Sequence, residues 1–80
     1  MKIIHNKIRG GQFLVFEQGA LICGDLEQDV YITLKRGHLY VLGTIRGKVE
    51  CLDQNSCIYC QKMEGAMICF GGIWLFSFAI

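Results

Sequence analysis

Short runs of β-forming residues, each closed by glycine or by a polar turn, recur along the whole chain. No stretch carries a hydrophobic stripe with the period of about 3.6 residues that an amphipathic helix shows. The pattern predicts strands at Gln12–Phe16, Ala20–Cys23, Val30–Leu34, His38–Leu42, Lys48–Leu52, Cys57–Gln61, Ala66–Phe70 and Gly72–Phe76. We therefore expect an all-β fold.

Alternation with a period of two indicates which side of several strands is buried. In the run from position 30 to 35, Tyr31, Thr33 and Lys35 share one side, and the aliphatic residues that alternate with them share the other. The same alternation applies to the predicted strands Lys48–Leu52 and Cys57–Gln61. The residues expected to face inward are Val30, Ile32, Leu34, Val49, Cys51, Ile58 and Cys60.

A weak internal repeat accompanies these strands. The segment Leu21–Leu26 is similar to Tyr40–Ile45, which lies 19 residues further on, and to Ile68–Ile73. A spacing of this size is a reasonable length for one coil of a β-solenoid, in which each coil stacks on the next and glycines turn the corners. A small antiparallel sandwich also has short strands and glycine turns, so the repeat leaves that alternative open.

The composition points to self-association and away from nucleic acid. In a chain of only 80 residues, 52% are hydrophobic and 19% are charged, which is more apolar surface than a small monomer easily buries. We therefore expect a homodimer that forms through an outer sheet face and includes outward positions such as Tyr40 and Leu42. The formal net charge of +1 gives no electrostatic basis for binding nucleic acid.

Five cysteines raise the question of disulfides or a metal. No apolar leader follows Met1, so we expect a cytoplasmic protein with reduced thiols. Cys57 and Cys60 have the spacing of metal ligands, but they have opposite strand parity, and a zinc site needs four convergent ligands. A small cysteine-based metal or thiol module that also uses Cys51 stays open as an alternative function.

No catalytic constellation is recognisable. His5 and His38 have no partnered serine or cysteine at a catalytic spacing, and the acidic residues are scattered near turns, where solvated carboxylates usually lie. We therefore expect neither an enzyme nor a cofactor. An acyltransferase of the left-handed β-helix type, suggested by Leu42-Gly43, would need that motif every six residues, and the chain lacks this repeat.

Two glycine-containing turns carry basic residues that could serve recognition. Arg9 and Gln12 flank Gly10-Gly11, and Arg46-Gly47-Lys48 places two cations around one glycine. From the residues alone, both segments can be read as ordinary turns with solvated neighbours or as partner-binding sites.

These turns belong to three longer segments. Residues 8–12 read Ile-Arg-Gly-Gly-Gln, and residues 37–48 read Gly-His-Leu-Tyr-Val-Leu-Gly-Thr-Ile-Arg-Gly-Lys. Residues 57–74 read Cys-Ile-Tyr-Cys-Gln-Lys-Met-Glu followed by Gly-Ala-Met-Ile-Cys-Phe-Gly-Gly-Ile-Trp. In this order and spacing they resemble the C-terminal domain of the bacterial septum-site-determining MinC family, with its Arg-Ser-Gly-Gln and Leu-Arg-Gly-Arg motifs. The resemblance spans roughly Ile8 to Trp74.

The resemblance implies a fold and a function. The fold is a short right-handed β-helix (a β-solenoid) of roughly triangular section, as a single domain over residues 1–80 in which residues 1–7 could be a flexible leader. The function is that of a dimeric, non-enzymatic adaptor in septum placement. Such an adaptor binds the membrane-associated ATPase MinD and contributes to antagonism of the tubulin-like division protein FtsZ. It is cytoplasmic and reaches the inner face of the cell membrane only through MinD.

The family's partner-binding residues carry over position by position. The MinD-binding motif corresponds to Arg9, Gly10, Gly11 and Gln12, and secondary contacts with FtsZ or MinD correspond to Arg46 and Lys48.

The chain also departs from the family pattern. Gly10 stands where the motif has serine, and Glu27-Gln28-Asp29 replaces a corner of small residues. The resemblance includes no counterpart of the family's separate N-terminal domain, its main division inhibitor. We therefore do not assign inhibition itself to these 80 residues.

Overall fold

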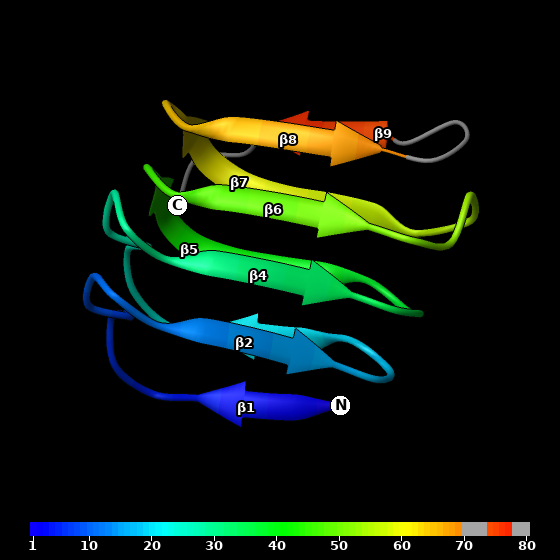
Figure 1. Ribbon diagram of the computed structural model, residues 1–80, viewed down its shortest axis with the longest axis horizontal. Helices are drawn as coiled ribbons and strands as arrows, with labels where there is room; N and C mark the ends of the chain where they lie inside the picture. The colour runs from blue at the N-terminus through cyan, green and yellow to red at the C-terminus, as the bar shows by residue number, and fades with distance from the viewer. Residues whose placement is uncertain (70–73, 78–80) are drawn as a thin grey trace.

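The computed structural model describes residues 1–69 and 74–77, and within these residues the chain forms parallel strands and no helix. The strands are β1 (Lys2–Ile4), β2 (Phe13–Phe16), β3 (Ala20–Ile22), β4 (Tyr31–Leu34), β5 (Leu39–Ile45), β6 (Lys48–Cys51), β7 (Cys57–Met63), β8 (Ala66–Cys69) and β9 (Trp74–Ser77). They wind into a right-handed β-solenoid of about four turns (Figure 1).

Two parallel sheets form two sides of the solenoid. One sheet has the order β1-β3-β5-β7-β9 and the other has the order β2-β4-β6-β8. Paired residues lie 17 to 19 positions apart along the chain, as for Tyr31 and Lys48 or Ala20 and Leu39. This distance confirms the coil length inferred from the repeat. Because the strand pairs are parallel, the antiparallel sandwich is excluded.

Stacked side chains from successive coils fill the interior. All of the positions expected to face inward are at most 1% exposed, so the parity prediction is confirmed. In the first sheet, Leu39 lies between Ala20 below it and Ile58 above it, and all three are fully buried. Such columns exclude water from the middle coils of the described chain and supply most of the hydrophobic stabilisation there.

A short third side closes each coil and gives the section its triangular outline. Ile8, Leu26 and Ile45 form single parallel bridges from one coil to the next, and Ile45 pairs with Met63 in the last of them. The register of β5 and β7 shifts between Val41 and Thr44, where β5 bends from the first sheet onto this third side. The third side positions the candidate site, because both predicted motifs follow it directly.

The structure corrects the predicted strand list in a few places. Lys2–Ile4 forms β1 and pairs with β3, although the residue pattern predicts no strand there. β5 and β7 extend to Ile45 and Met63, beyond the predicted ends, because they continue around the corner. The predicted strand ends at Phe70 and at positions 72–73, and most of the third repeat copy, lie outside the described residues.

Candidate functional site

The turn Arg9–Gln12 lies between the third side of the first coil and β2, and it is fixed to the coil above by backbone hydrogen bonds. The Gly11 amide donates to the Asp29 carbonyl at 3.2 Å, and the Tyr31 amide donates to the Gln12 carbonyl at 2.9 Å. Gly11 has a φ of 81°, which a glycine adopts without strain. The side chains of Arg9 and Gln12 are exposed, so the turn has a fixed backbone and accessible functional groups.

The two departures from the family pattern lie at the same corner. The Gly10 amide donates to Glu27 Oε2 at 3.3 Å, and a Cβ at position 10 would lie 3.3 Å from the Cβ of Asp29. A serine at position 10 would therefore crowd Asp29. Glycine at position 10 therefore leaves room for the acidic corner 27–29, whose side chains are larger than the small residues of the family pattern.

Arg46 lies between two carboxylates, at the edge of the solenoid that also carries the Arg9–Gln12 turn. Its Nη1 lies 2.8 Å from Asp25 Oδ2 and its Nε lies 3.3 Å from Glu64 Oε1. Asp25 also accepts the Thr44 backbone amide at 2.8 Å, and Lys62 Nζ lies 2.9 Å from Glu64 Oε2. This network crosses three coils.

The same network sets the titration behaviour of its members. The hydrogen bond from the Thr44 amide, followed by the guanidinium of Arg46, lowers the pKa of Asp25. The hydrogen bond from Lys62, and to a smaller extent Arg46, lowers the pKa of Glu64. Both carboxyl groups therefore stay ionised at neutral pH and keep Arg46 in place.

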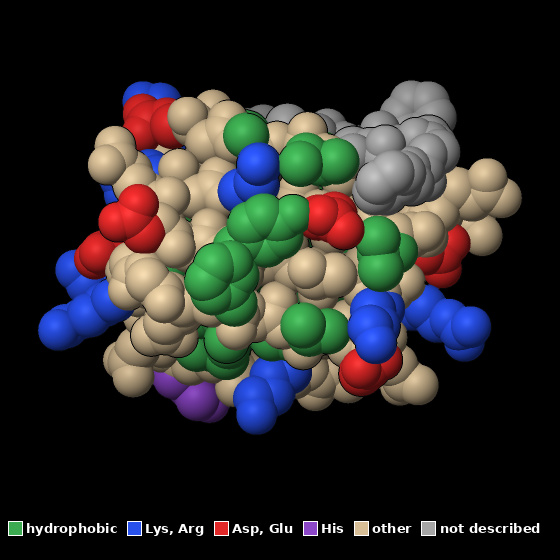
Figure 2. Space-filling view, viewed as in Figure 1, with side chains coloured by type: hydrophobic (Ala, Val, Ile, Leu, Met, Phe, Trp, Pro, Cys, Tyr) green, Lys and Arg blue, Asp and Glu red, His purple; other side chains and the backbone are tan. Residues whose placement is uncertain are grey.

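Lys48 points away from this network, onto the outer face of the second sheet. Its Nζ lies 5.6 Å from the centroid of the Tyr31 ring, within the range of a cation–π contact. The Tyr31 hydroxyl donates to the Glu50 carboxylate, which raises the pKa of Tyr31. On the other side of Tyr31, the Phe13 ring is 5.8 Å away. Figure 2 shows apolar side chains interspersed with charged ones on this face.

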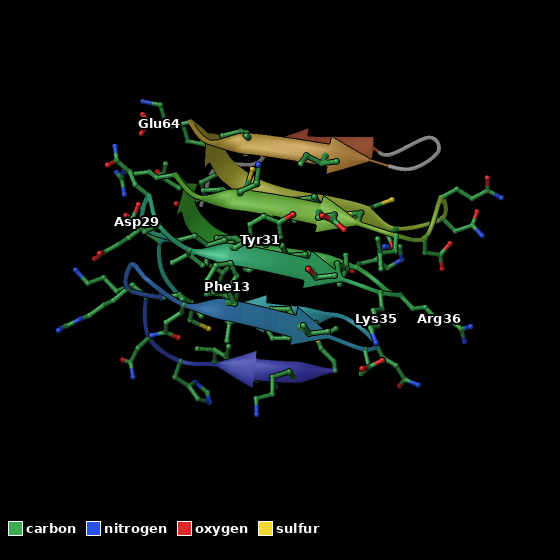
Figure 3. All side chains as sticks on the ribbon, in the orientation of Figure 1. Phe13, Asp29, Tyr31, Lys35, Arg36 and Glu64 are labelled. Atoms are coloured by element: carbon green, nitrogen blue, oxygen red, sulfur yellow. The ribbon has the colours of Figure 1, made fainter. Side chains whose placement is uncertain are left out.

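The structure thus joins the two predicted motifs only in part. Gly10 and Arg46 line one surface groove of about 330 Å³, together with the acidic corner 27–29. Lys48 does not line this groove. Figure 3 shows Asp29 and Glu64 at this edge of the solenoid, and Lys35 and Arg36 at the opposite edge.

The outer face of the first sheet carries an aromatic stack. Tyr40 and Tyr59 occupy paired positions on β5 and β7, and their rings lie 4.8 Å apart at an interplanar angle of 7°. His38 approaches both rings edge-on, and its Nδ1 accepts the Cys57 amide at 3.1 Å. Burial raises the pKa of Tyr59. The half-buried tyrosines and the exposed His38 form a largely apolar outward surface.

The cysteine pair of the alternative function does not converge. Cys60 is fully buried in the interior column beside Val41, and burial raises the pKa of its thiol. Cys57 is half-buried, at a position of opposite parity on the same strand. Among residues 1–69 and 74–77, no group of three or more His, Cys, Asp or Glu side chains could hold a metal ion.

The network of charged side chains around Arg46 was not predicted from the sequence, in which the acidic residues indicate scattered, solvated carboxylates. Its signal is the coil spacing, since residues of alternating charge recur every 18 or 19 positions. The residues of this series are Arg9, Glu27, Arg46 and Glu64. The registers of the third side place each member beside the next, and a Lys7–Glu27 ion pair of 3.4 Å joins the first two coils.

In the described part of the chain, no helix is long and apolar enough to span a membrane.

Comparison with known proteins identifies a relative. The chain is 39% identical over 67 residues to the probable septum site-determining protein MinC of Persephonella marina. The match includes 80% of this chain and 33% of the relative, so the chain spans about a third of that protein's length. No protein-family model and no solved structure matches the chain. The β-solenoid is the fold that the resemblance to the MinC family implied. The sequence identity shows that the chain is a MinC-related domain, which corresponds to the C-terminal part of that protein.

Proposed function

We propose that this domain is a non-enzymatic adaptor in the selection of the division site, which binds the ATPase MinD and contributes to antagonism of FtsZ assembly at the wrong sites. The relationship to a septum site-determining protein supports the cellular process. Binding to MinD would bring the domain from the cytoplasm to the inner face of the cell membrane.

The observation that carries the proposal is the Arg9–Gln12 turn. Its backbone is fixed to the next coil while its two polar side chains are exposed. Little conformational entropy is lost when a partner binds such a preorganised turn. The Arg9 guanidinium can form a bidentate contact with a carboxylate, Gln12 offers a donor and an acceptor, and Gly11 has open space around it.

Arg46 and Lys48 have different roles in this proposal. Arg46 is engaged by Asp25 and Glu64, so its main effect is to hold three coils together at the groove beside Gly10. Lys48 lies on the open face of the second sheet and is the more accessible cation for an acidic segment of FtsZ or for MinD.

We further propose a homodimer formed through the outer face of the first sheet. Tyr40, Tyr59 and the half-buried Leu42 give this face the apolar and aromatic character of an interface core. An isologous dimer should be populated at micromolar concentration. Light scattering that shows a monomer at about 100 µM would contradict this part of the proposal.

The MinD contact is tested by a binding titration of the Arg9→Ala/Gln12→Ala double variant. Truncating a central arginine of an interface costs about 2 kcal/mol, which corresponds to a loss of affinity of roughly thirtyfold. Arg36→Ala is the matched control, because Arg36 is an exposed arginine at the opposite edge of the solenoid (Figure 3). Thermal melts of the three proteins verify the fold, and a double variant that binds MinD like the control would remove this turn from the site.

A further inference from the structure

Asp29 lies directly on the Arg9–Gln12 turn, although it belongs to the next coil. Its Oδ2 atom is 3.5 Å from the position that a Cβ on Gly10 would take, and its own Cβ is 3.3 Å from the same point. The Gly11 amide donates to the Asp29 carbonyl, which fixes the backbone of Asp29 relative to the turn. Because Gly10 has no side chain, a partner that contacts the backbone of this turn must also contact the carboxylate of Asp29.

The other charged side chains of the groove beside Gly10 have partners within the domain. Glu27 accepts the Gly10 amide at 3.3 Å and lies 3.4 Å from the ammonium group of Lys7. Arg46 lies between two carboxylates. By contrast, the carboxylate of Asp29 makes no ion pair and no hydrogen bond with any residue that the structure describes. Asp29 is therefore the acid of this groove that a partner has to accommodate.

Arg9 and Asp29 give the turn one charge of each sign. Both side chains are exposed, and within residues 1–69 and 74–77 neither makes an ion pair. A partner that presented only acidic groups would be attracted by Arg9 and repelled by Asp29, two effects that oppose each other at neighbouring positions. A partner surface that matches the turn must therefore carry charges of both signs.

Desolvation determines what the partner has to supply at Asp29. A carboxylate that loses its water in an interface, and gains neither a cation nor hydrogen-bond donors, destabilises the complex strongly. Since the turn cannot be covered without covering Asp29, tight binding requires a donor at this position. A lysine or arginine side chain supplies the donor and also balances the charge.

We propose that the partner that binds the Arg9–Gln12 turn presents a basic side chain to Asp29, so that Asp29 selects the partner by charge. The inference rests on the proposed function, in which this partner is MinD, and adds the chemistry of the contact. An acidic group of the partner pairs with Arg9, and a lysine or arginine of the partner pairs with Asp29. Two adjacent pairs of opposite polarity also fix the orientation in which the two proteins meet.

A binding titration with MinD tests the inference in two variants of Asp29. Asp29→Asn keeps the size of the side chain and removes its charge, and it should weaken binding about tenfold. Asp29→Lys should weaken binding at least about a hundredfold, because the basic side chain of the partner then meets a like charge. Asp29 is exposed, so thermal melts should show a fall in Tm of a few degrees at most for either variant.

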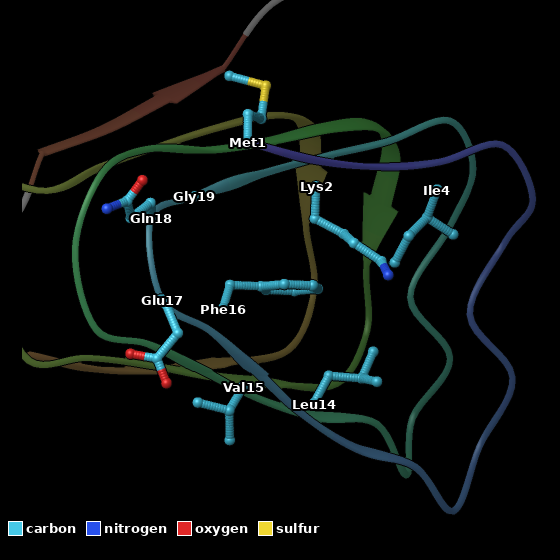
Figure 4. Close-up of a pocket in the computed structure, with 9 residues that line it drawn as sticks. All are labelled: Met1, Lys2, Ile4, Leu14, Val15, Phe16, Glu17, Gln18 and Gly19. Carbon is cyan, nitrogen blue, oxygen red and sulfur yellow. The ribbon is translucent and has the colours of Figure 1, made fainter.

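Glu17→Gln is the matched control, because Glu17 is also an exposed carboxylate. Its Oε1 lies 3.3 Å from Nζ of Lys35, which Figure 3 shows at the opposite edge of the solenoid from Asp29. Glu17 lines a separate groove of about 420 Å³ between β1 and β2 (Figure 4). The control should bind MinD within about twofold of the unchanged domain.

A second comparison separates a contact with the partner from an effect on Arg9. If Asp29 only oriented the neighbouring guanidinium, its replacement would have no effect once that group is gone. In the Arg9→Ala background, Asp29→Asn should still weaken binding about tenfold, because the basic side chain of the partner has lost its counter-charge.

Failure of the inference can be told apart from failure of the proposed function. If Arg9→Ala/Gln12→Ala weakens binding while the Asp29 variants bind like Glu17→Gln, the turn is the site and the basic contact is wrong. The inference is also wrong if Asp29→Asn binds more tightly than the unchanged domain, because the partner then presents only acidic groups to the turn. The same conclusion follows if Asp29→Asn has no effect in the Arg9→Ala background. If the unchanged domain does not bind MinD, the inference fails together with the proposed function.

Discussion

Replacing Gly47 with alanine should weaken the stacking of coils at the corner between the third side and the second sheet. A Cβ on this residue would lie 2.3 Å from the Val30 carbonyl oxygen and 2.8 Å from the Glu27 carbonyl oxygen, both in the coil below. Backbone atoms cannot rotate away as a flexible side chain could. The coils must therefore separate by about 1 Å to reach ordinary contact distances.

The magnitude follows from what this separation breaks. The Val30 carbonyl accepts the Lys48 amide at 2.9 Å, and a shift of about 1 Å would lengthen this bond beyond hydrogen-bonding range. Loss of a buried backbone hydrogen bond costs about 1–3 kcal/mol, and overpacking adds a similar amount. The reduced entropy of the unfolded chain offsets less than about 1 kcal/mol. We expect a net loss of about 3 kcal/mol.

Thermal and denaturant melts measure this loss. For a domain of this size, about 3 kcal/mol corresponds to a fall in Tm of about 15 °C. Gly10→Ala is the matched control, because the nearest atom to its Cβ would be the Asp29 Cβ, at 3.3 Å, and the nearest backbone atom would be at 3.8 Å, so the Tm should fall by a few degrees at most. If Gly47→Ala melts within about 3 °C of the unchanged domain, the steric argument is wrong.

Three further predictions address the core, the charged edge and the thiols. Leu39→Ala, in the middle of a fully buried column, should lower the free energy of unfolding by about 2–5 kcal/mol in urea titrations. The lowered pKa values of Asp25 and Glu64 favour folding above their unfolded values of 3.8 and 4.5. This contribution should be lost as the pH falls through the lower native values, and the loss should be smaller in Arg46→Ala when melts are compared from pH 7 downwards. Iodoacetamide should label Cys57 in the native protein and Cys60 only after unfolding, as judged by mass spectrometry of peptides.

The interior of the solenoid could be predicted because strand parity is a local property. The alternation around Ile32 and the coil spacing between Leu21 and Tyr40 were visible in the sequence, and both agree with the registers. β1 could not be predicted in the same way. It has three residues, one of them an inward lysine, and it is a strand because β3 provides hydrogen-bonding partners.

The exposure of the Arg9–Gln12 turn was predictable from the sequence, but the contacts of Arg46 were not. Arg9 and Gln12 are exposed on a turn, as a glycine pair between polar residues suggested. The engagement of Arg46 by Asp25 and Glu64 depends on which residues stack across coils, and 18 or 19 positions separate the stacked residues. A charge pattern at that spacing becomes informative only once the coil length is known.

Retention of MinD tests the central claim, that this solenoid is an adaptor for MinD, most directly. The domain would be immobilised and incubated with purified MinD in the presence of ATP and, separately, of ADP, with circular dichroism to verify that it is folded. MinD should be retained in at least one nucleotide state. A folded domain that retains MinD in neither state would contradict the claim.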